Sequence, residues 1–188
     1  MKIKLGISNR HIHLNEEDYE LLFGKEEMKV KNKLSQTGQY ASNLTVDIKT
    51  EKNIIKNVRV IGPIRTYTQL EISRTDSYTL GIKSPVRASG NLSGASRVTI
   101  IGPNRTISRN CGIIAERHIH LSPEDVEKRN LQNVKEVSVF FNSEKQTLFL
   151  NVKLKVEDKG VWELHLDTDE ANAAMLKEQD IGEVLIIK

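Results

Sequence analysis

Four of the five histidines in this 188-residue sequence fall in two His-X-His pairs, His11 with His13 and His118 with His120. On a β-strand, residues two positions apart point to the same side, so each pair can offer two imidazoles to one metal ion. A single pair of this kind is more typical of a solvated surface strand. Here the pair occurs twice in a chain with only one other histidine, and this favours a metal-binding role.

Each pair needs a further ligand to form a metal site. The remaining histidine, His165, lies in a segment that alternates apolar and polar residues, and we predict it as the third ligand of one pair. For the other pair the best-placed carboxylate is Glu71, which the alternation of residues 63–76 puts on the polar face of a strand together with Arg65. The spacing alone does not decide whether Glu71 is a metal ligand or a solvated strand residue. Three protein ligands would leave the fourth position of a catalytic zinc ion to an anion.

The two His-X-His pairs belong to an internal repeat. Residues 7–18 and 114–125 share eight identities in twelve positions at a constant offset of 107. In each copy an N-cap residue, Asn15 or Ser122, precedes acidic residues, which predicts a short helix after each strand. Short β-branched runs dominate the rest of the chain. We therefore expect a mainly β protein of two duplicated antiparallel β-barrel domains with short helices.

The domain limits follow from the same repeat. We predict a first barrel over residues 1–90 and a second over 91–188, with a boundary between 90 and 113 and with terminal strands able to exchange between the barrels. Residues 84–96, SPVRASGNLSGAS, are too polar for a core, and a loop of this length is often functional.

Composition and charge exclude several classes of protein. With 38% hydrophobic residues and a net charge of only +3, the chain can bury a core and is unlike a disordered protein. Runs of five basic residues and apolar stretches of 18 residues are both absent from the sequence, so we expect neither nucleic acid nor a membrane as partner. A single cysteine, Cys111, excludes an intramolecular disulfide, and its apolar flanks predict a buried thiol that takes no part in catalysis.

Five motifs occur in the order and spacing of one known family: GISNRHIHL, GPIRTYTQLEISRTD, PVRASG, ERHIHLSPED and LHLDTDEANAA. Over residues 5–176 the chain resembles the PduL-type phosphate propanoyltransferases, zinc phosphotransacylases associated with bacterial microcompartments. The resemblance implies a dinuclear zinc site between two barrels, a homodimer, and exchange of an acyl group between coenzyme A and phosphate. Members targeted to a microcompartment carry an N-terminal extension, whereas this sequence begins at its first strand. We therefore expect a cytoplasmic location, with the lumen of a bacterial microcompartment as the alternative.

The resemblance also implies roles for individual residues. It implies one zinc ion on His11, His13 and Glu71, a second on His118, His120 and His165, phosphate on Arg65, and coenzyme A on Ile7, Ser8, Asn9 and Asn172. In the predicted reaction, zinc-bound phosphate attacks the thioester carbonyl of propanoyl-CoA or acetyl-CoA directly, and the products are an acyl phosphate and coenzyme A.

Two other functions are consistent with a pair of His-X-His motifs. A dinuclear zinc hydrolase is one, although the fold that commonly carries this motif is a barrel of about 250 residues with a helix after every strand. A noncatalytic binding module stabilised by zinc is the other, although structural zinc sites usually have four ligands. Release of thiol from acyl-CoA that depends on phosphate would separate the three functions.

Overall fold

Each His-X-His pair lies on a short strand followed by a short helix in the computed structural model, which describes residues 1–186. These elements are β2 (His11–His13) with α1 (Glu16–Phe23), and β10 (His118–Leu121) with α3 (Pro123–Lys128). The side chain of Asn15 caps the first helix by accepting from the Asp18 amide, and that of Ser122 caps the second by accepting from the Asp125 amide. The predicted strand–helix repeat is therefore confirmed.

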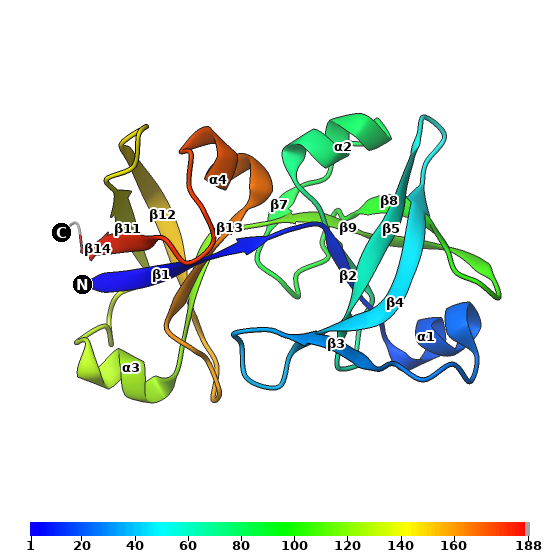
Figure 1. Cartoon of the computed structure of the whole chain (residues 1–188), viewed down its shortest axis with the longest axis horizontal. Helices are drawn as coiled ribbons and strands as arrows, with labels where there is room; N and C mark the ends of the chain where they lie inside the picture. The colour runs from blue at the N-terminus through cyan, green and yellow to red at the C-terminus, as the bar shows by residue number, and fades with distance from the viewer. Residues whose placement is uncertain (187–188) are drawn as a thin grey trace. The chain divides into compact units, whose positions relative to one another are not determined.

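The first compact unit comprises residues Arg10–Ala115. Besides β2 and α1 it contains β3 (Val30–Lys33), β4 (Tyr40–Lys49), β5 (Ile54–Gly62), β6 (Gln69–Glu71), α2 (Arg74–Leu80), β7 (Val86–Arg87), β8 (Ser96–Ile101) and β9 (Thr106–Ala115). Six strands close into a barrel in the order β4-β5-β2-β6-β9-β8, since β8 pairs with both β9 and β4. We call this unit the first barrel (Figure 1).

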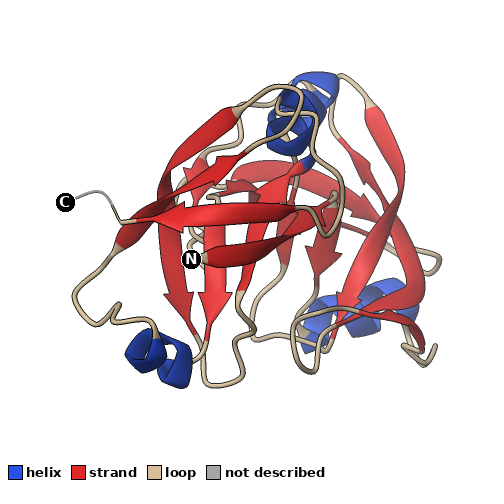
Figure 2. Ribbon diagram, turned by 60° about the vertical axis from the view of Figure 1, so that its left-hand side comes forward, coloured by secondary structure: helices blue, strands red, loops and turns tan. Residues whose placement is uncertain are grey.

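The second compact unit combines Met1–Asn9 with the described chain from Glu116 onward. Besides β10 and α3 it contains β1 (Lys2–Ser8), β11 (Glu136–Phe141), β12 (Thr147–Val156), β13 (Glu163–Asp167), α4 (Thr168–Ala173) and β14 (Ile181–Leu185). Its strands form a closed barrel in the order β1-β13-β10-β12-β11-β14, the second barrel. Strands dominate both units, and the helices are few and short (Figure 2). In the described part of the chain, no helix has the length and apolar character needed to cross a membrane.

Both barrels have the same pattern of strand directions. In each, four of the six pairings are antiparallel and two are parallel. The parallel pairs are β2–β5 and β6–β9 in the first barrel, and β10–β12 and β1–β13 in the second. The mainly β fold with two barrels is thus as predicted, and the shared pattern reflects the duplication in the sequence.

The middle residue of each HIH segment anchors its strand in a core. Ile12 and Ile119 are fully buried, each within the apolar cluster of its own barrel. Burying an isoleucine side chain contributes about 1.5–3 kcal/mol, so this contact fixes which face of the strand points inward. Because successive side chains alternate, the flanking histidines must point to the opposite face of the sheet.

The division of the chain differs from the predicted limits of 1–90 and 91–188, but the predicted exchange of a terminal strand between the barrels is found for β1. The strand that precedes each HIH segment belongs to the other barrel: β1 pairs with β13 and β14, whereas β9 pairs with β6 and β8. Under the offset of 107, β1 corresponds to the end of β9, so the two copies exchange equivalent strands. Local sequence patterns report that a strand exists, but they do not report its distant pairing partner.

Candidate metal centres

The first candidate centre consists of His11, His13 and Glu71, whose potential ligand atoms all lie within 4.8 Å of one another. The antiparallel ladder of β2 and β6 sets this geometry. It places His11 directly opposite Glu71, and His13 directly opposite Gln69. The middle pair of the ladder, Ile12 and Leu70, enters the core, so the polar residues converge on the other face.

The carboxylate of Glu71 is held in a fixed orientation. The side-chain amide of Gln69 donates to its Oε1 atom at 2.7 Å, and the hydroxyl of Ser89 donates to the same atom at 3.1 Å. The other oxygen, Oε2, faces Nε2 of His11 across 3.6 Å. The loop of residues 84–96 therefore contacts this centre through Ser89, and the backbone amide of Gly90 donates to Gln69.

His13 is the most deeply buried member of the first centre. Its Nδ1 atom has no hydrogen-bond partner of ordinary geometry, although a backbone interaction with Ile61 acts on the ring. Burial holds the pKa of His13 well below its usual value, and the neighbouring charges of His11 and Arg65 lower it further. The ring is therefore neutral at physiological pH, which is the form of histidine that binds a metal ion.

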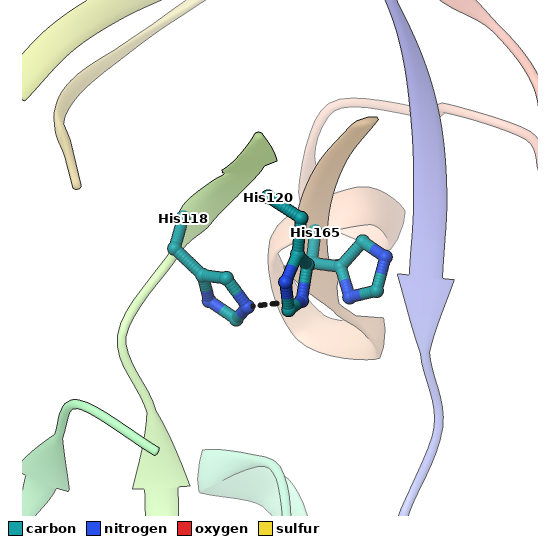
Figure 3. A group of neighbouring side chains, drawn as sticks. All are labelled: His118, His120 and His165. Atoms are coloured by element: carbon teal, nitrogen blue, oxygen red, sulfur yellow. Dashed lines mark hydrogen bonds between the residues drawn. The ribbon is translucent and has the colours of Figure 1, made fainter. Parts of the chain in front are cut away.

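The second candidate centre repeats the register of the first. It consists of His118, His120 and His165, again with all ligand atoms within 4.8 Å of one another. His118 lies opposite His165 in the antiparallel ladder of β10 and β13, and His120 lies opposite Glu163. Figure 3 shows the three imidazoles converging from these two strands. The third ligand thus lies opposite the first histidine of the pair in both barrels.

Hydrogen bonds fix the tautomers of two of these rings. Nδ1 of His118 donates to the carbonyl oxygen of Glu116 at 2.7 Å, because a carbonyl can only accept. Nδ1 of His120 is 2.7 Å from a carboxylate oxygen of Glu157 and donates to it in the same way. In the neutral rings the lone pair is then on Nε2, and the two Nε2 atoms lie 3.0 Å apart (Figure 3).

A metal ion between these two nitrogen atoms would bind both of them. Burial, with His165 and His118 nearby, lowers the pKa of His120 to about 3, so this ring is neutral at physiological pH, which is the form of histidine that binds a metal ion. Tetrahedral zinc with Zn–N bonds of about 2.0–2.1 Å would place its two nitrogen ligands about 3.3 Å apart. The second centre therefore fits a zinc-type ion, and so does the first with its two imidazoles and one carboxylate.

Arg65 lies beside the first centre, but the prediction that it is on a strand with Glu71 is wrong. The strand β6 begins only at Gln69, and Arg65 is held in the preceding loop by a backbone hydrogen bond to the Leu14 carbonyl. Its guanidinium bonds two neutral groups, the Tyr67 hydroxyl at 3.3 Å and the Gln39 side-chain oxygen at 3.4 Å. Within residues 1–186 it forms no ion pair with a carboxylate. Among the described residues, Arg65 thus has no carboxylate as a counter-ion.

The residues linked to coenzyme A by resemblance lie in the second barrel. Ile7 and Ser8 end β1, and Ser8 is opposite Asp167, which caps the helix α4. Asn172 is an exposed residue of that helix, and Asn9 follows β1 directly. The structure therefore brings Ile7 and Ser8 to the β-strand that leads into the helix carrying Asn172.

Cys111 lies on β9 and is 1% exposed. Burial raises the pKa of its thiol to about 12, so almost no thiolate is present at neutral pH. The prediction that the thiol is buried is therefore confirmed.

Four residues at the two centres were absent from the sequence-based prediction: Gln69, Ser89, Glu157 and Glu163. Two of them had a usable signal, since Gln69 and Glu163 stand two positions before a predicted third ligand and hence on the same strand face. Ser89 and Glu157 reach the centres through tertiary contacts, which a local sequence pattern does not reveal.

The fold and the two centres define a class: a protein of two β-barrels, each with a three-residue cluster suited to a transition-metal ion. The family model described as phosphate propanoyltransferase matches residues 4–177, and the chain belongs to this family of acyltransferase enzymes. A phosphate propanoyltransferase of Thermotoga maritima is 47% identical over 182 residues, covering 95% of this chain and 87% of that protein.

Two further relatives carry the same description. A phosphate propanoyltransferase of Citrobacter freundii is 47% identical over 174 residues, which are 92% of this chain and 83% of that protein. One of Salmonella typhimurium is 45% identical over the same shares of the two chains. The protein is accordingly an acyltransferase.

Proposed function

We propose that the protein transfers a short-chain acyl group between coenzyme A and inorganic phosphate, with propanoyl-CoA or acetyl-CoA as substrate. The observation that carries this proposal is Arg65, a guanidinium next to the first centre that has no carboxylate partner among residues 1–186 and bonds two neutral groups. Such a group is suited to a doubly charged oxyanion. The names of the relatives, all phosphate propanoyltransferases, support phosphate as that anion.

Two zinc ions per chain belong to this proposal. His11, His13 and Glu71 would hold one ion, and His118, His120 and His165 would hold the other. When bound, zinc supplies positive charge that binds phosphate oxygens and stabilises negative charge developing on the thioester carbonyl. Each set offers three ligands from the described residues, as catalytic zinc sites do.

Arg65 would bind phosphate with two parallel N–H donors and so orient a third oxygen toward the substrate. That oxygen attacks the thioester carbonyl carbon, a C–O bond forms, and the C–S bond breaks with its electron pair leaving on sulfur. The thiol of coenzyme A has a pKa of about 8.5 by analogy with cysteine, so the thiolate leaves without a strong general acid. Cys111 is unsuited to an acyl-enzyme step, because its pKa is raised to about 12.

The binding of coenzyme A is assigned to Ile7, Ser8, Asn9 and Asn172. The support is that Ile7, Ser8 and the cap of α4 are neighbours in the second barrel, and that Asn172 is exposed on that helix. The homodimer that the family resemblance implies is a separate proposal, which light scattering on the purified protein would test.

Phosphate dependence of thiol release is the decisive experiment. Purified protein is mixed with propanoyl-CoA, with and without phosphate, and both free thiol and acyl phosphate are measured. We expect thiol and acyl phosphate to appear together and only with phosphate. A hydrolase would release thiol without phosphate, and a noncatalytic module would release none; either result would refute the proposal.

A further inference from the structure

Each candidate centre has one more polar side chain at an equivalent place, directly opposite the second histidine of its pair. Gln69 lies opposite His13 in the first barrel, and Glu163 lies opposite His120 in the second. Neither belongs to the three-residue sets. Gln69 is completely buried and Glu163 is 4% exposed. Burial of such groups is costly unless they are hydrogen-bonded, so their partners show what keeps them there.

In both barrels this side chain bonds the third ligand of its own centre. The amide nitrogen of Gln69 donates to Oε1 of Glu71 at 2.7 Å. Oε2 of Glu163 accepts from Nε2 of His165 at 2.8 Å. Each side chain has the hydrogen-bonding group that its ligand requires: Gln69 donates to a carboxylate, and Glu163 accepts from an imidazole N–H. A glutamate at position 69 would instead place two carboxylates against each other.

The bond from Glu163 also selects the ligand atom of His165. With the proton on Nε2, the lone pair of the neutral ring is on Nδ1. In Figure 3 the nitrogen of His165 next to the point of attachment is turned toward His120, and Nε2 is turned away. The ring centroids of His120 and His165 are 4.6 Å apart. Nδ1 is therefore the atom of His165 that faces the centre.

A glycine in the neighbouring strand makes room for this pair. Gly6 of β1 lies opposite His165, and a Cβ atom added there would come within 3.1 Å of both Oε2 of Glu163 and Nε2 of His165. Contacts this short are tighter than normal van der Waals distance. The backbone of β1 thus leaves the bond between Glu163 and His165 undisturbed only because residue 6 lacks a side chain.

We propose that Gln69 and Glu163 are positioning residues, each of which fixes the orientation and the ligand atom of the third ligand of its centre. This inference rests on the metal centres of the proposed function. Partners of this kind typically contribute a factor of about 10 to 100 in metal affinity. Because each side chain bonds a ligand of its own barrel, each should affect only one of the two centres.

The test measures zinc affinity separately at each centre. The first background is His13→Ala, in which the first centre is disabled and zinc binding reports the second centre. There, Glu163→Gln removes the charge of the acceptor with little change of shape. The second background is His120→Ala, in which the second centre is disabled and zinc binding reports the first centre. There, Gln69→Met removes the amide that donates to Glu71. Zinc dissociation constants come from competition with a chromophoric chelator, and the visible absorption of bound Co²⁺ reports the ligand geometry. Glu136→Gln, an exposed carboxylate of the second barrel that pairs with Lys153, is the matched control.

We expect each variant to weaken zinc at its own centre by about 10- to 100-fold and to alter the Co²⁺ spectrum there, with full occupancy still reached at high zinc. Glu136→Gln should change neither. Circular dichroism of the metal-free proteins checks folding, and Gly6→Ala, which presses on the same pair, replaces Glu163→Gln if that variant unfolds.

Unchanged affinity and spectrum in a folded variant would overturn the positioning role. Complete loss of zinc from the second centre in Glu163→Gln, as in His165→Ala, would overturn it too, because Glu163 would then be a ligand. If the unmodified protein itself binds no zinc, the metal centres of the proposed function fail and this inference fails with them. That result differs from one in which the protein binds two zinc ions tightly and the variants at Gln69 and Glu163 leave their affinity unchanged. In the second case the positioning role fails while the metal centres stand.

Discussion

Replacement of Arg65 by alanine tests the phosphate-binding step of the proposed reaction. The two hydrogen bonds of its guanidinium to Tyr67 and Gln39 are long, at 3.3 and 3.4 Å, so the fold loses little when they are removed. A charge-assisted hydrogen bond to phosphate is worth about 1.5–3 kcal/mol. Since about 1.4 kcal/mol is a factor of ten in rate, loss of the two parallel bonds that Arg65 would make to phosphate should reduce phosphate-dependent turnover by about 10²-fold or more.

The zinc content of the same variant separates this role from damage to the first centre. The charge of Arg65 is one of the causes that lower the pKa of His13, so it also opposes any other cation there. Its removal should leave zinc affinity at the first centre unchanged or slightly stronger, while turnover falls. Arg65→Lys should recover little activity, because an ammonium group cannot reproduce the two parallel donors of a guanidinium.

The assay follows thiol release from propanoyl-CoA at varied phosphate concentration. Arg105→Ala removes an exposed arginine of the same barrel and should behave like the unmodified protein. Turnover and KM for phosphate that are both unchanged in Arg65→Ala would refute the phosphate-binding role. A parallel loss of zinc would refute the reasoning in another way, because Arg65 would then support the metal centre.

Three further predictions concern the metal, the thiol and the stability of the first barrel. His13→Ala should lose about one of two zinc ions and most activity, as measured by metal analysis and the thiol assay, whereas equal zinc content would contradict the first centre. With its pKa raised to about 12, Cys111 should resist alkylation at pH 8 in the native protein and react once the protein is unfolded. Cys111→Ser should retain most activity, and trapping of an acylated Cys111 would refute this prediction. Arg109→Ala removes the cation that pairs with the fully buried carboxylate of Asp18, which keeps its hydrogen bond from the Thr68 hydroxyl. The free energy of unfolding, measured with denaturant, should fall by about 2–3 kcal/mol, and a loss below about 0.5 kcal/mol would count against this pair.

The features that the sequence predicted correctly depend on neighbours within a few residues. The caps at Asn15 and Ser122 bond amides three positions ahead, so their residue types and spacing are sufficient to locate α1 and α3. The convergence of His11 and His13, and of His118 and His120, follows from the strand period of two. The alternation around His165 likewise puts Leu164 and Leu166 in the core and His165 on the opposite face.

Glu71 marks the limit of this local reasoning. The predicted strand over residues 63–76 is in fact a three-residue strand, β6, preceded by a loop, so the alternation that joined Arg65 to Glu71 does not exist. What brings Glu71 to the histidines is its register with His11 across the ladder of β2 and β6. Register is set by which residues of two distant segments enter the core together, here Ile12 and Leu70, and no single segment contains that information.

The exchange of β1 and β9 explains why the predicted boundary could not describe the barrels. A segment of residues 1–90 would contain β4, β5, β2 and β6 of the first barrel but neither β8 nor β9, so the open edges of β4 and β6 would lack their partners. Unpaired edges expose backbone donors and acceptors and favour pairing with another chain. Residues 10–115 contain all six strands of that barrel. The unit of duplication in the sequence and the unit of folding are therefore different stretches of chain, offset by the one strand that precedes each HIH segment.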